Sequence, residues 1–353
     1  MKIAIVGHFG GDEFYTDGQT VKIKSLYEAL KYYLPADAKI DIVDTYYLKR
    51  NNRKLFFDFI KAVASCNKII FLPASRGRKY FFKLFYFINI LTKKKIYHDC
   101  IAGSLDKELA YHKYWVRYLN SFESNWMESP EQVEKLKEAG VRNCVYVPNF
   151  KHITPLSVDY LKNLTYSEPF RFCTFSRVEE RKGIEDALVA IKNINRRCGT
   201  KKAELDVYGP IQPGHEKWFE SIIEKYSEEC KYLGVVDPNN SVDVLKDYFA
   251  LLFPTQYYTE GMPGTIIDAM FAGVPVIARR WVWCDNMITN GKNGISYEFD
   301  KPELLESILQ KVVENPSMIT MMKENCLKEA DKYSETVIIK KILKLLRIDN
   351  VVI

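Results

Sequence analysis

Short runs of β-branched and aromatic residues alternate with longer helical patterns along almost the whole chain. In the amino-terminal half, the expected strands are KIAIVGH (2–8), KIDIVDTYY (39–47), KIIFL (68–72), KKIYHDCI (94–101) and CVYVPNF (144–150). A second series follows at 171–177, 204–209, 250–254, 275–279 and 294–299. Strands that alternate with helices form parallel sheets, because each parallel connection must cross over the sheet. The pattern therefore predicts an α/β fold with two Rossmann-like, doubly wound domains.

The length of the chain agrees with two domains, since 353 residues exceed one typical domain. A polar, proline-containing segment, 151–169, separates the two series of strands. We expect a first domain over 1–160, a second over 161–335, and a carboxyl-terminal helix in 336–353 that packs back on the first domain. Ligands of such sheets bind outside the carboxyl ends of the strands, so we expect the site in a cleft between the domains.

Composition excludes several classes of protein. No apolar run reaches the roughly 20 residues of a membrane-spanning helix, and the start MKIAIVGHFGG lacks the pattern of a secretory signal. The eight cysteines are scattered without a C-x-x-C pair, which argues against a disulfide scaffold and a structural zinc site. We therefore expect a cytoplasmic protein without a bound metal.

The segment PTQYYTEGMPGTIIDAMFAGVPVIA (254–278) carries the strongest chemical signal. Its pattern predicts a strand end, a loop and then a helix that begins near Thr265 and stops at Gly273. Bare backbone N–H groups at such a helix start bind phosphate. Glu260 and Asp268 are carboxylates suited to sugar or ribose hydroxyls. The residues expected to contact this ligand are Glu260, Gly261, Met262, Pro263, Gly264, Thr265 and Asp268.

This segment resembles the donor-binding signature of family-4 glycosyltransferases, which are retaining enzymes of the GT-B fold. That signature is a glutamate, seven residues and a second glutamate; here Glu260 takes the first place and Asp268, one methylene shorter, the second. The resemblance implies that Glu260 contacts the donor sugar and that Asp268 contacts the ribose of the nucleotide.

The segment FSRVEERKGIEDALVAI (175–191) is similar to the basic motif of the same family. The resemblance implies that Arg177 and Lys182 bind the nucleotide diphosphate. Two cations at this place would stabilise the departing diphosphate without a metal. Glu260, Arg177 and Lys182 are thus the expected catalytic residues.

Three further segments resemble parts of the family. GHFGGDEFYTDGQTVK (7–22) is similar to its glycine-rich first loop, although an ordinary strand-to-helix turn is an alternative. VYGP (207–210) and YLGVVD (232–237) are placed like the segments beside the nucleotide base, although plain packing at a sheet edge is an alternative for both. His98 is either a donor-sugar contact or a structural histidine at a strand end. The expected donor-binding residues in these segments are Gly10, Gly11, Gly18, Tyr208, Gly209 and Val236.

The resemblance implies a retaining, metal-independent hexosyltransferase that needs no cofactor. We expect it to transfer a sugar from a nucleotide-diphosphate donor, a UDP-hexose or UDP-N-acetylhexosamine, to a hydroxyl of a glycan. Within the family it is most similar to enzymes of bacterial capsule, exopolysaccharide or O-antigen synthesis, so a lipid-linked acceptor is expected. The sequence does not distinguish UDP from GDP as the nucleotide of the donor. The alternatives are a nucleotide-sugar epimerase and a catalytically silent GT-B partner subunit.

Residues 49–95 form a basic stretch, with 13 Lys or Arg and only one acid, Asp58. Aromatic residues are interleaved with the cations, as in RGRKYFFKLFYFINILTKKK (76–95). This pattern indicates peripheral contact with an anionic membrane at its cytoplasmic face. The alternative is a solvated charged face with the aromatics in the core. We do not expect nucleic acid, because the rest of the chain resembles an enzyme that uses nucleotide sugars.

Overall fold

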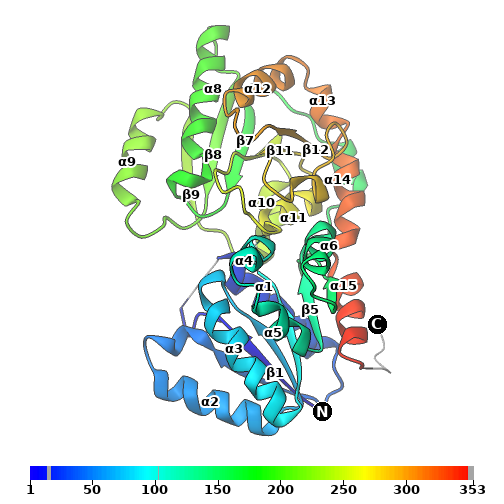
Figure 1. Ribbon diagram of the computed structural model, residues 1–353. Coiled ribbons are helices and arrows are strands. Elements are labelled where there is room, and N and C mark those ends of the chain that lie inside the picture. The colour runs from blue at the N-terminus through cyan, green and yellow to red at the C-terminus, as the bar shows by residue number, and fades with distance from the viewer. Residues whose placement is uncertain (14–16, 102, 349–353) are drawn as a thin grey trace. The chain divides into compact units, whose positions relative to one another are not determined.

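The computed structural model describes residues 1–13, 17–101 and 103–348 (Figure 1). The chain divides into two compact units, one of residues 1–152 together with the segment from Tyr333 onward, and one of residues 153–332. The sequence placed these boundaries at 160/161 and 335/336. The carboxyl-terminal helix α15 (Glu335–Leu345) contributes to a core of the first unit with α1 (Gly18–Tyr33).

The first unit contains a six-stranded parallel sheet in the order β2-β1-β3-β4-β5-β6. Helices α1 and α15 cover one face and α2 to α6 cover the other. The strands are β1 (Lys2–Gly7), β2 (Lys39–Asp44), β3 (Lys68–Leu72), β4 (Lys95–Asp99), β5 (Ser124–Met127) and β6 (Cys144–Tyr146). The helices of the second face are α2 (Asn52–Ser65), α3 (Ser75–Thr92), α4 (Leu105–Tyr111), α5 (Trp115–Ser121) and α6 (Pro130–Glu138).

The second unit contains another parallel sheet, in the order β12-β11-β10-β7-β8-β9. Helices α8, α9, α12 and α13 share one core with it, and α11 packs on α10 and α14. The strands are β7 (Phe170–Phe175), β8 (Ala203–Tyr208), β9 (Cys230–Gly234), β10 (Ala250–Phe253), β11 (Val276–Arg279) and β12 (Gly294–Tyr297). The helices are α7 (Val158–Lys162), α8 (Ile184–Cys198), α9 (Glu216–Lys225), α10 (Ser241–Leu245), α11 (Gly264–Phe271), α12 (Leu304–Glu314), α13 (Ser317–Thr320) and α14 (Lys323–Ala330).

The expected α/β class, with two doubly wound parallel sheets, is confirmed. Two strands were missed, β5 and β9, because SNWM and CKYLG carry no β-branched residue. The strand expected over 144–150 ends at Tyr146. In each sheet the strand order reverses once, between β1 and β3 and between β10 and β7. Such a reversal leaves a crevice outside the carboxyl ends of the two strands, where ligands of these sheets bind.

A buried ion cluster joins helix α1 to the carboxyl ends of β4 and β5. The Lys22 Nζ atom lies 2.7 Å from Asp99 Oδ1 and 2.9 Å from Glu128 Oε1, and it donates to the carbonyl of Cys100 at 3.0 Å. Burial disfavours the ammonium, yet the two carboxylates raise the pKa of Lys22 above its ordinary value. Burial raises the pKa of Asp99. The cluster thus fixes the first turns of α1 against this edge of the sheet.

Candidate functional site

The two segments that resemble the family motifs meet at the reversal point of the second sheet. The 175–191 segment follows β7, and the 254–278 segment follows β10, which is the neighbour of β7. The loop after β10 also bonds to the loop after β7, since the amide of Gln256 donates to the carbonyl of Arg181 at 2.8 Å. The topology of the sheet therefore brings together residues that are far apart in the sequence.

Lys182 and Glu260 form the centre of this site. The Lys182 Nζ atom lies 2.5 Å from Glu260 Oε1, and the side chains are 12% and 18% exposed. The hydroxyl of Thr255 donates to the same carboxylate oxygen at 3.0 Å. In such a largely buried setting the attraction between the charges is stronger than in water. A cation and a carboxylate thus stand side by side at the expected place for a ligand.

A chain of contacts connects this pair to Arg177. The ring of Tyr257 lies 5.0 Å from Lys182 Nζ, and its hydroxyl donates to Glu179 Oε2 at 3.0 Å. The other oxygen of Glu179 lies 3.6 Å from an Arg177 nitrogen. Burial, followed by the hydrogen bond to Glu179, raises the pKa of Tyr257. Arg177 and Lys182 therefore share one network, in which Arg177 is the more exposed cation.

Gly183 explains why these two loops approach so closely. It adopts a left-handed conformation with φ of 73°, between Lys182 and the first residue of α8. A Cβ atom at Gly183 would lie only 2.1 Å from the carbonyl oxygen of Pro254. Only glycine fits both the dihedral angle and the space at this position.

Helix α11 starts at Gly264, four residues after Glu260, and the first amides of a helix have no partner within it. Its N-cap residue, Pro263, makes no side-chain hydrogen bond to the first turn. The Thr265 hydroxyl oxygen is buried and has no hydrogen-bond partner. Free amides at a helix start, together with an unpartnered hydroxyl, favour an anion as the ligand. Gly261 holds the loop in place, since its carbonyl accepts from the indole of Trp281 at 3.1 Å, while the Met262 side chain is buried.

Asp268 lies one turn further along α11 and is 3% exposed. Its Oδ1 atom accepts a hydrogen bond from the Ser241 hydroxyl at 2.9 Å, across the contact between α10 and α11. The structure thus places Asp268 deeper than Glu260. Its role toward a ribose stays a prediction.

At the end of β8, the structure separates the roles expected for Tyr208 and Gly209. The hydroxyl of Tyr208 is buried and lies 2.9 Å from that of Tyr248, which favours a packing role for this side chain, and its place beside a nucleotide base stays a prediction. Gly209 has φ of 130°, and a Cβ there would lie 1.8 Å from the Ser176 carbonyl oxygen. Gly209 therefore allows β8 to end against the β7 loop, while Val236 lies half-buried after β9.

In the first unit, the glycine-rich turn after β1 is held by Asp44. Its carboxylate accepts from the amides of Phe9 and Gly11, each at 2.8 Å. Gly10 and Gly11 have φ of 90° and 58°, and a Cβ at Gly11 would lie 2.7 Å from the Tyr46 ring. The turn thus requires these glycines for its own geometry, as the ordinary-turn alternative states.

Gly18 begins helix α1, and a Cβ there would meet no atom within 4 Å. No close contact of the backbone therefore requires a glycine at position 18. Residues 14–16 of the same segment lie outside the described residues.

His98 is wholly buried among aromatic rings, 5.1 Å from Phe71 and 4.9 Å from Phe82 between centroids. Its Nδ1 atom lies 3.2 Å from the Asn125 side-chain oxygen. Burial lowers the pKa of His98 well below its ordinary value, so the ring is neutral. The burial of His98 favours the alternative of a structural histidine, and its contact with a donor sugar stays a prediction.

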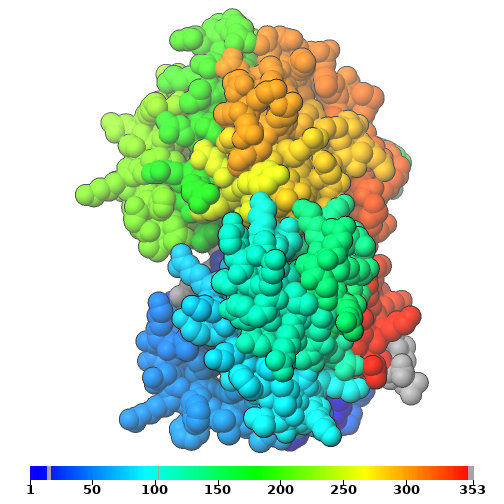
Figure 2. All heavy atoms as spheres, in the orientation of Figure 1, coloured from blue at the N-terminus to red at the C-terminus, as the bar shows by residue number. Residues whose placement is uncertain are grey.

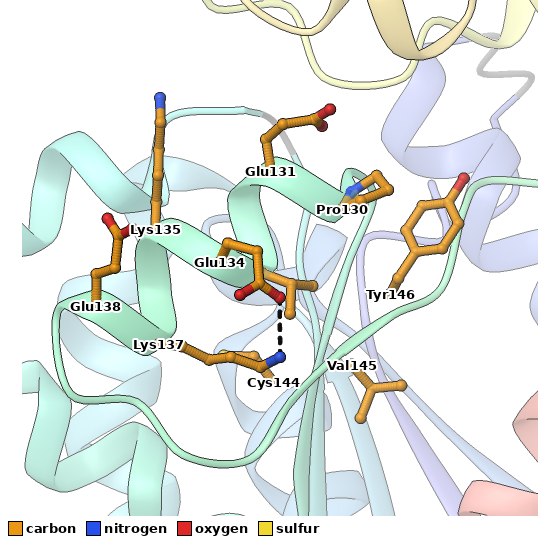
Figure 3. A pocket seen from close by; sticks show the side chains of 10 residues that line it. Pro130, Glu131, Glu134, Lys135, Lys137, Glu138, Cys144, Val145 and Tyr146 are labelled. Atoms are coloured by element: carbon orange, nitrogen blue, oxygen red, sulfur yellow. Dashed lines mark hydrogen bonds and ion pairs between the residues drawn. The ribbon is translucent and has the colours of Figure 1, made fainter.

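A surface hollow in the first unit lies between α6 and the edge strand β6 (Figure 3). The ion pair of Lys137 with Glu134, at 2.9 Å, lies in it, while Glu131 and Lys135 point away from β6 (Figure 3). None of the expected site residues lines this hollow. Within 1–13, 17–101 and 103–348, no three His, Cys, Asp or Glu side chains form a group that could hold a metal ion.

The sequence did not single out Thr255, Tyr257, Glu179 or Gln212, which accepts from Arg177 at 3.2 Å. Three of these residues lie inside or beside the two motifs, so polar residues in the motif loops were the available signal. Gln212 follows a different strand, and its contact depends on the order of the strands, which the sequence does not reveal.

Comparison with known proteins finds relatives among glycosyltransferases, and the matched region contains both motif segments. Residues 161–329 match the family model described as Glycosyl transferases group 1. The alpha-monoglucosyldiacylglycerol synthase of Acholeplasma laidlawii is 24% identical over 254 residues, which cover 72% of this chain and 56% of that protein. The chain thus spans little more than half the length of that relative.

Comparison with solved structures identifies the fold of this chain. Sucrose-phosphate synthase from Thermosynechococcus elongatus superposes with a TM-score of 0.74 at 16% identity, over 98% of each chain. HepE of Anabaena in complex with UDP-glucose gives a TM-score of 0.69 at 14% identity, over 98% of this chain and 99% of that one. These likenesses confirm the GT-B fold expected from the sequence.

Proposed function

We propose that this chain, whose second unit belongs to the glycosyl transferases group 1 family, transfers a sugar from a nucleotide-diphosphate donor to an acceptor hydroxyl. The contact between Lys182 and Glu260 carries this proposal. In such a donor the anomeric carbon of the sugar is bonded through oxygen to the terminal phosphate. A cation for the phosphate and a carboxylate for the sugar hydroxyls must therefore be neighbours, as these two residues are.

The phosphates of the donor have a suitable place at the start of α11. The amides of Gly264 and Thr265, together with the unpartnered Thr265 hydroxyl, are donors for phosphate oxygens. Arg177 and Lys182 supply positive charge within the same network. Since the donor carries two negative charges on its diphosphate, two cations and a helix start match its demand.

The sugar and the acceptor are the finer part of the proposal. HepE was solved in complex with UDP-glucose, and the relative from Acholeplasma laidlawii is named as a synthase of alpha-monoglucosyldiacylglycerol, a lipid that carries glucose. We therefore propose a UDP-hexose or UDP-N-acetylhexosamine as the donor and a lipid-linked glycan hydroxyl as the acceptor, in the synthesis of a cell-surface glycan. A cytoplasmic, membrane-peripheral location belongs to the same proposal.

The proposed mechanism is front-face attack with retention of configuration. As the bond between the sugar and the diphosphate breaks, negative charge develops on the diphosphate and positive charge on the sugar ring. Arg177 and Lys182 stabilise the departing diphosphate, so the protein itself supplies charge that a metal ion supplies elsewhere. Glu260 orients the sugar through its hydroxyls, and a phosphate oxygen accepts the proton of the acceptor hydroxyl.

One experiment separates this function from its two alternatives. The purified protein is incubated with UDP-glucose, UDP-N-acetylglucosamine or GDP-mannose, with and without a glucosylated diacylglycerol acceptor, in buffer with EDTA. Transfer that needs both substrates, with an α linkage by NMR, supports a retaining and metal-independent glycosyltransferase. Conversion of the nucleotide sugar without an acceptor would indicate an epimerase. If the protein neither converts nor binds any of the nucleotide sugars, the result would indicate a silent partner subunit.

A further inference from the structure

Helices α2 and α3 of the first unit carry an unusual set of exposed apolar side chains. The three exposed phenylalanines of the described residues, Phe56, Phe57 and Phe87, all lie on these two helices. Large exposed apolar patches on a soluble unit mark interaction surfaces, whereas single exposed side chains do not. The exposed apolar residues of the two helices are Phe56, Phe57, Ile60, Tyr80, Leu84, Phe87, Ile90 and Leu91, and we call them the α2–α3 apolar face.

These side chains point away from the sheet on one side of the unit. The opposite faces of the helices are packed, since Phe59 of α2 lies against Phe85 of α3 at 5.9 Å between ring centroids. Both helices share the same core with the sheet, and Figure 1 shows them as neighbours. In α3, the exposed residues Tyr80, Leu84, Phe87 and Leu91 follow helical spacing. Figure 2 shows both helices at the surface of the first unit.

Exposed cations flank the apolar face. They are Arg53 and Lys61 on α2 and Arg76, Lys79 and Lys83 on α3. Within the described part of the chain, none of these five forms an ion pair with an acid. Asp58, the single acid of residues 49–95, is bound to Lys54 at 2.7 Å. Apart from the Lys54–Asp58 pair, the exposed charges that these two helices carry among the apolar residues are therefore positive.

The positive charge of these helices indicates which kind of partner can bind the α2–α3 apolar face. A second copy of the chain, bound face to face, would bring unpaired cations against like cations. An anionic bilayer accepts the apolar side chains at the boundary of its acyl chains and the cations among its phosphates. No helix within the described residues is long and apolar enough to span a membrane, so both helices would lie along the surface.

We propose that the α2–α3 apolar face docks the first unit on the surface of a membrane that contains anionic lipids. The aromatic and aliphatic side chains enter the headgroup boundary, and the five flanking cations contact lipid phosphates. This inference rests on the membrane-peripheral location in the proposed function and names the surface and the lipid class for it. Because it needs no residue of the Lys182–Glu260 site, its test can fail while the proposed sugar transfer holds.

Vesicle sedimentation without any nucleotide tests the proposal. The full chain is mixed with vesicles of phosphatidylcholine, or of phosphatidylcholine with phosphatidylglycerol, at low and high salt. One variant combines Phe57→Ser with Phe87→Ser, and another combines Lys79→Glu with Lys83→Glu. The matched control combines Tyr32→Ser with Lys31→Glu, because these exposed residues lie on α1, which covers the opposite face of the sheet. Circular dichroism checks that each variant is folded.

We expect the wild type to prefer the anionic vesicles by about tenfold or more, with a loss of binding at high salt. Each of the two test variants should reduce binding by about tenfold, whereas the control should change it by less than about twofold. Equal binding to both kinds of vesicle, or unchanged binding by both folded test variants, would overturn the proposal. A dimer in size-exclusion chromatography that Phe57→Ser with Phe87→Ser abolishes, without vesicle binding, would also overturn it and indicate a second copy as the occupant.

Discussion

The Lys182 ammonium lies 2.5 Å from the Glu260 carboxylate, although 78 positions separate the two residues in the sequence. In the absence of a donor, the cation that we assign to the diphosphate is thus balanced by the acid that we assign to the sugar. A bound donor would place its phosphate beside the same ammonium and its hydroxyls beside the same carboxylate. The pair is therefore prepared to exchange an internal contact for contacts with a ligand, without leaving a buried charge unpaired.

Removal of either member of the pair should slow sugar transfer. We expect Lys182→Ala and Glu260→Ala each to reduce turnover by about 10²- to 10³-fold, the usual loss for one charge partner of a transition state. The effects should be less than additive in the double variant, because the two side chains contact each other. Initial rates with saturating donor and acceptor measure these losses.

Lys217→Ala is the matched control, since Lys217 is an exposed lysine of α9 in the same unit. Its turnover should equal that of the wild type. Turnover within about twofold of the wild type for Lys182→Ala or Glu260→Ala would remove that residue from the proposed mechanism.

Much of the site follows from the sequence because its residues lie in two local motifs at strand ends. Arg177, Lys182 and Glu260 were named from the resemblance of their segments to family motifs, and the structure brings the three into one network. The sequence did not predict that β7 and β10 are neighbours in the sheet, because strand order depends on long-range packing. Consequently, Tyr257, which connects the two motifs, and Gln212, which binds Arg177 from the loop after β8, were not found.

The surroundings of strand-end residues were harder to predict in both units. His98 near the end of β4 and Tyr208 at the end of β8 occur where ligands often bind, yet both side chains are buried. Which face of a strand end points outward depends on the packing of helices that the local sequence does not specify. Strand β5, SNWM, was missed because it has no β-branched residue and because two of its four buried residues are polar.

The close approach at Gly183 predicts a specific loss of stability. Gly183→Ala should destabilise the protein by about 2 kcal/mol more than Gly199→Ala. Both glycines flank α8 with similar φ, 73° and 66°, but a Cβ at Gly199 would meet no atom within 4 Å. The difference between the two variants therefore isolates the contact with Pro254. Urea unfolding measures the free energy of unfolding of both variants. Equal values would show that the loop can move to accept a Cβ at position 183 without loss of stability.

The ion cluster of the first unit predicts unequal effects of its members. Lys22→Met should destabilise the protein by about 3 to 5 kcal/mol, because two buried carboxylates would lose their cation. Asp99→Asn should cost clearly less, since Lys22 keeps its contact with Glu128. Scanning calorimetry of the three proteins ranks them. A Lys22→Met protein as stable as Asp99→Asn would contradict the assignment of Lys22 as the shared partner.

Lys323 predicts a pH dependence in the second unit. Its ammonium is buried and donates to the carbonyls of Tyr248 and Gly273, and burial lowers its pKa to about 8 from 10.5. Between these values the unfolded chain binds more protons than the folded one, so this group makes stability rise as the pH increases. The stability of the wild type relative to Lys323→Met should increase by about 3 kcal/mol from pH 7 to 10.5. Unfolding in urea at several pH values tests this, and a constant difference would show that the pKa is not lowered.

Nucleotide binding tests the central claim most directly. Thermal unfolding is followed with increasing UDP, GDP and ADP for the wild type, Lys182→Ala and the Lys217→Ala control. A ligand at 100 times its dissociation constant stabilises the folded state by about 2.7 kcal/mol, which raises the melting temperature by several degrees. The account predicts such a shift with UDP for the wild type and for Lys217→Ala, and its loss in Lys182→Ala. An unchanged melting temperature with all three nucleotides, or an equal shift in Lys182→Ala, would contradict a nucleotide-sugar site at Lys182 and Glu260.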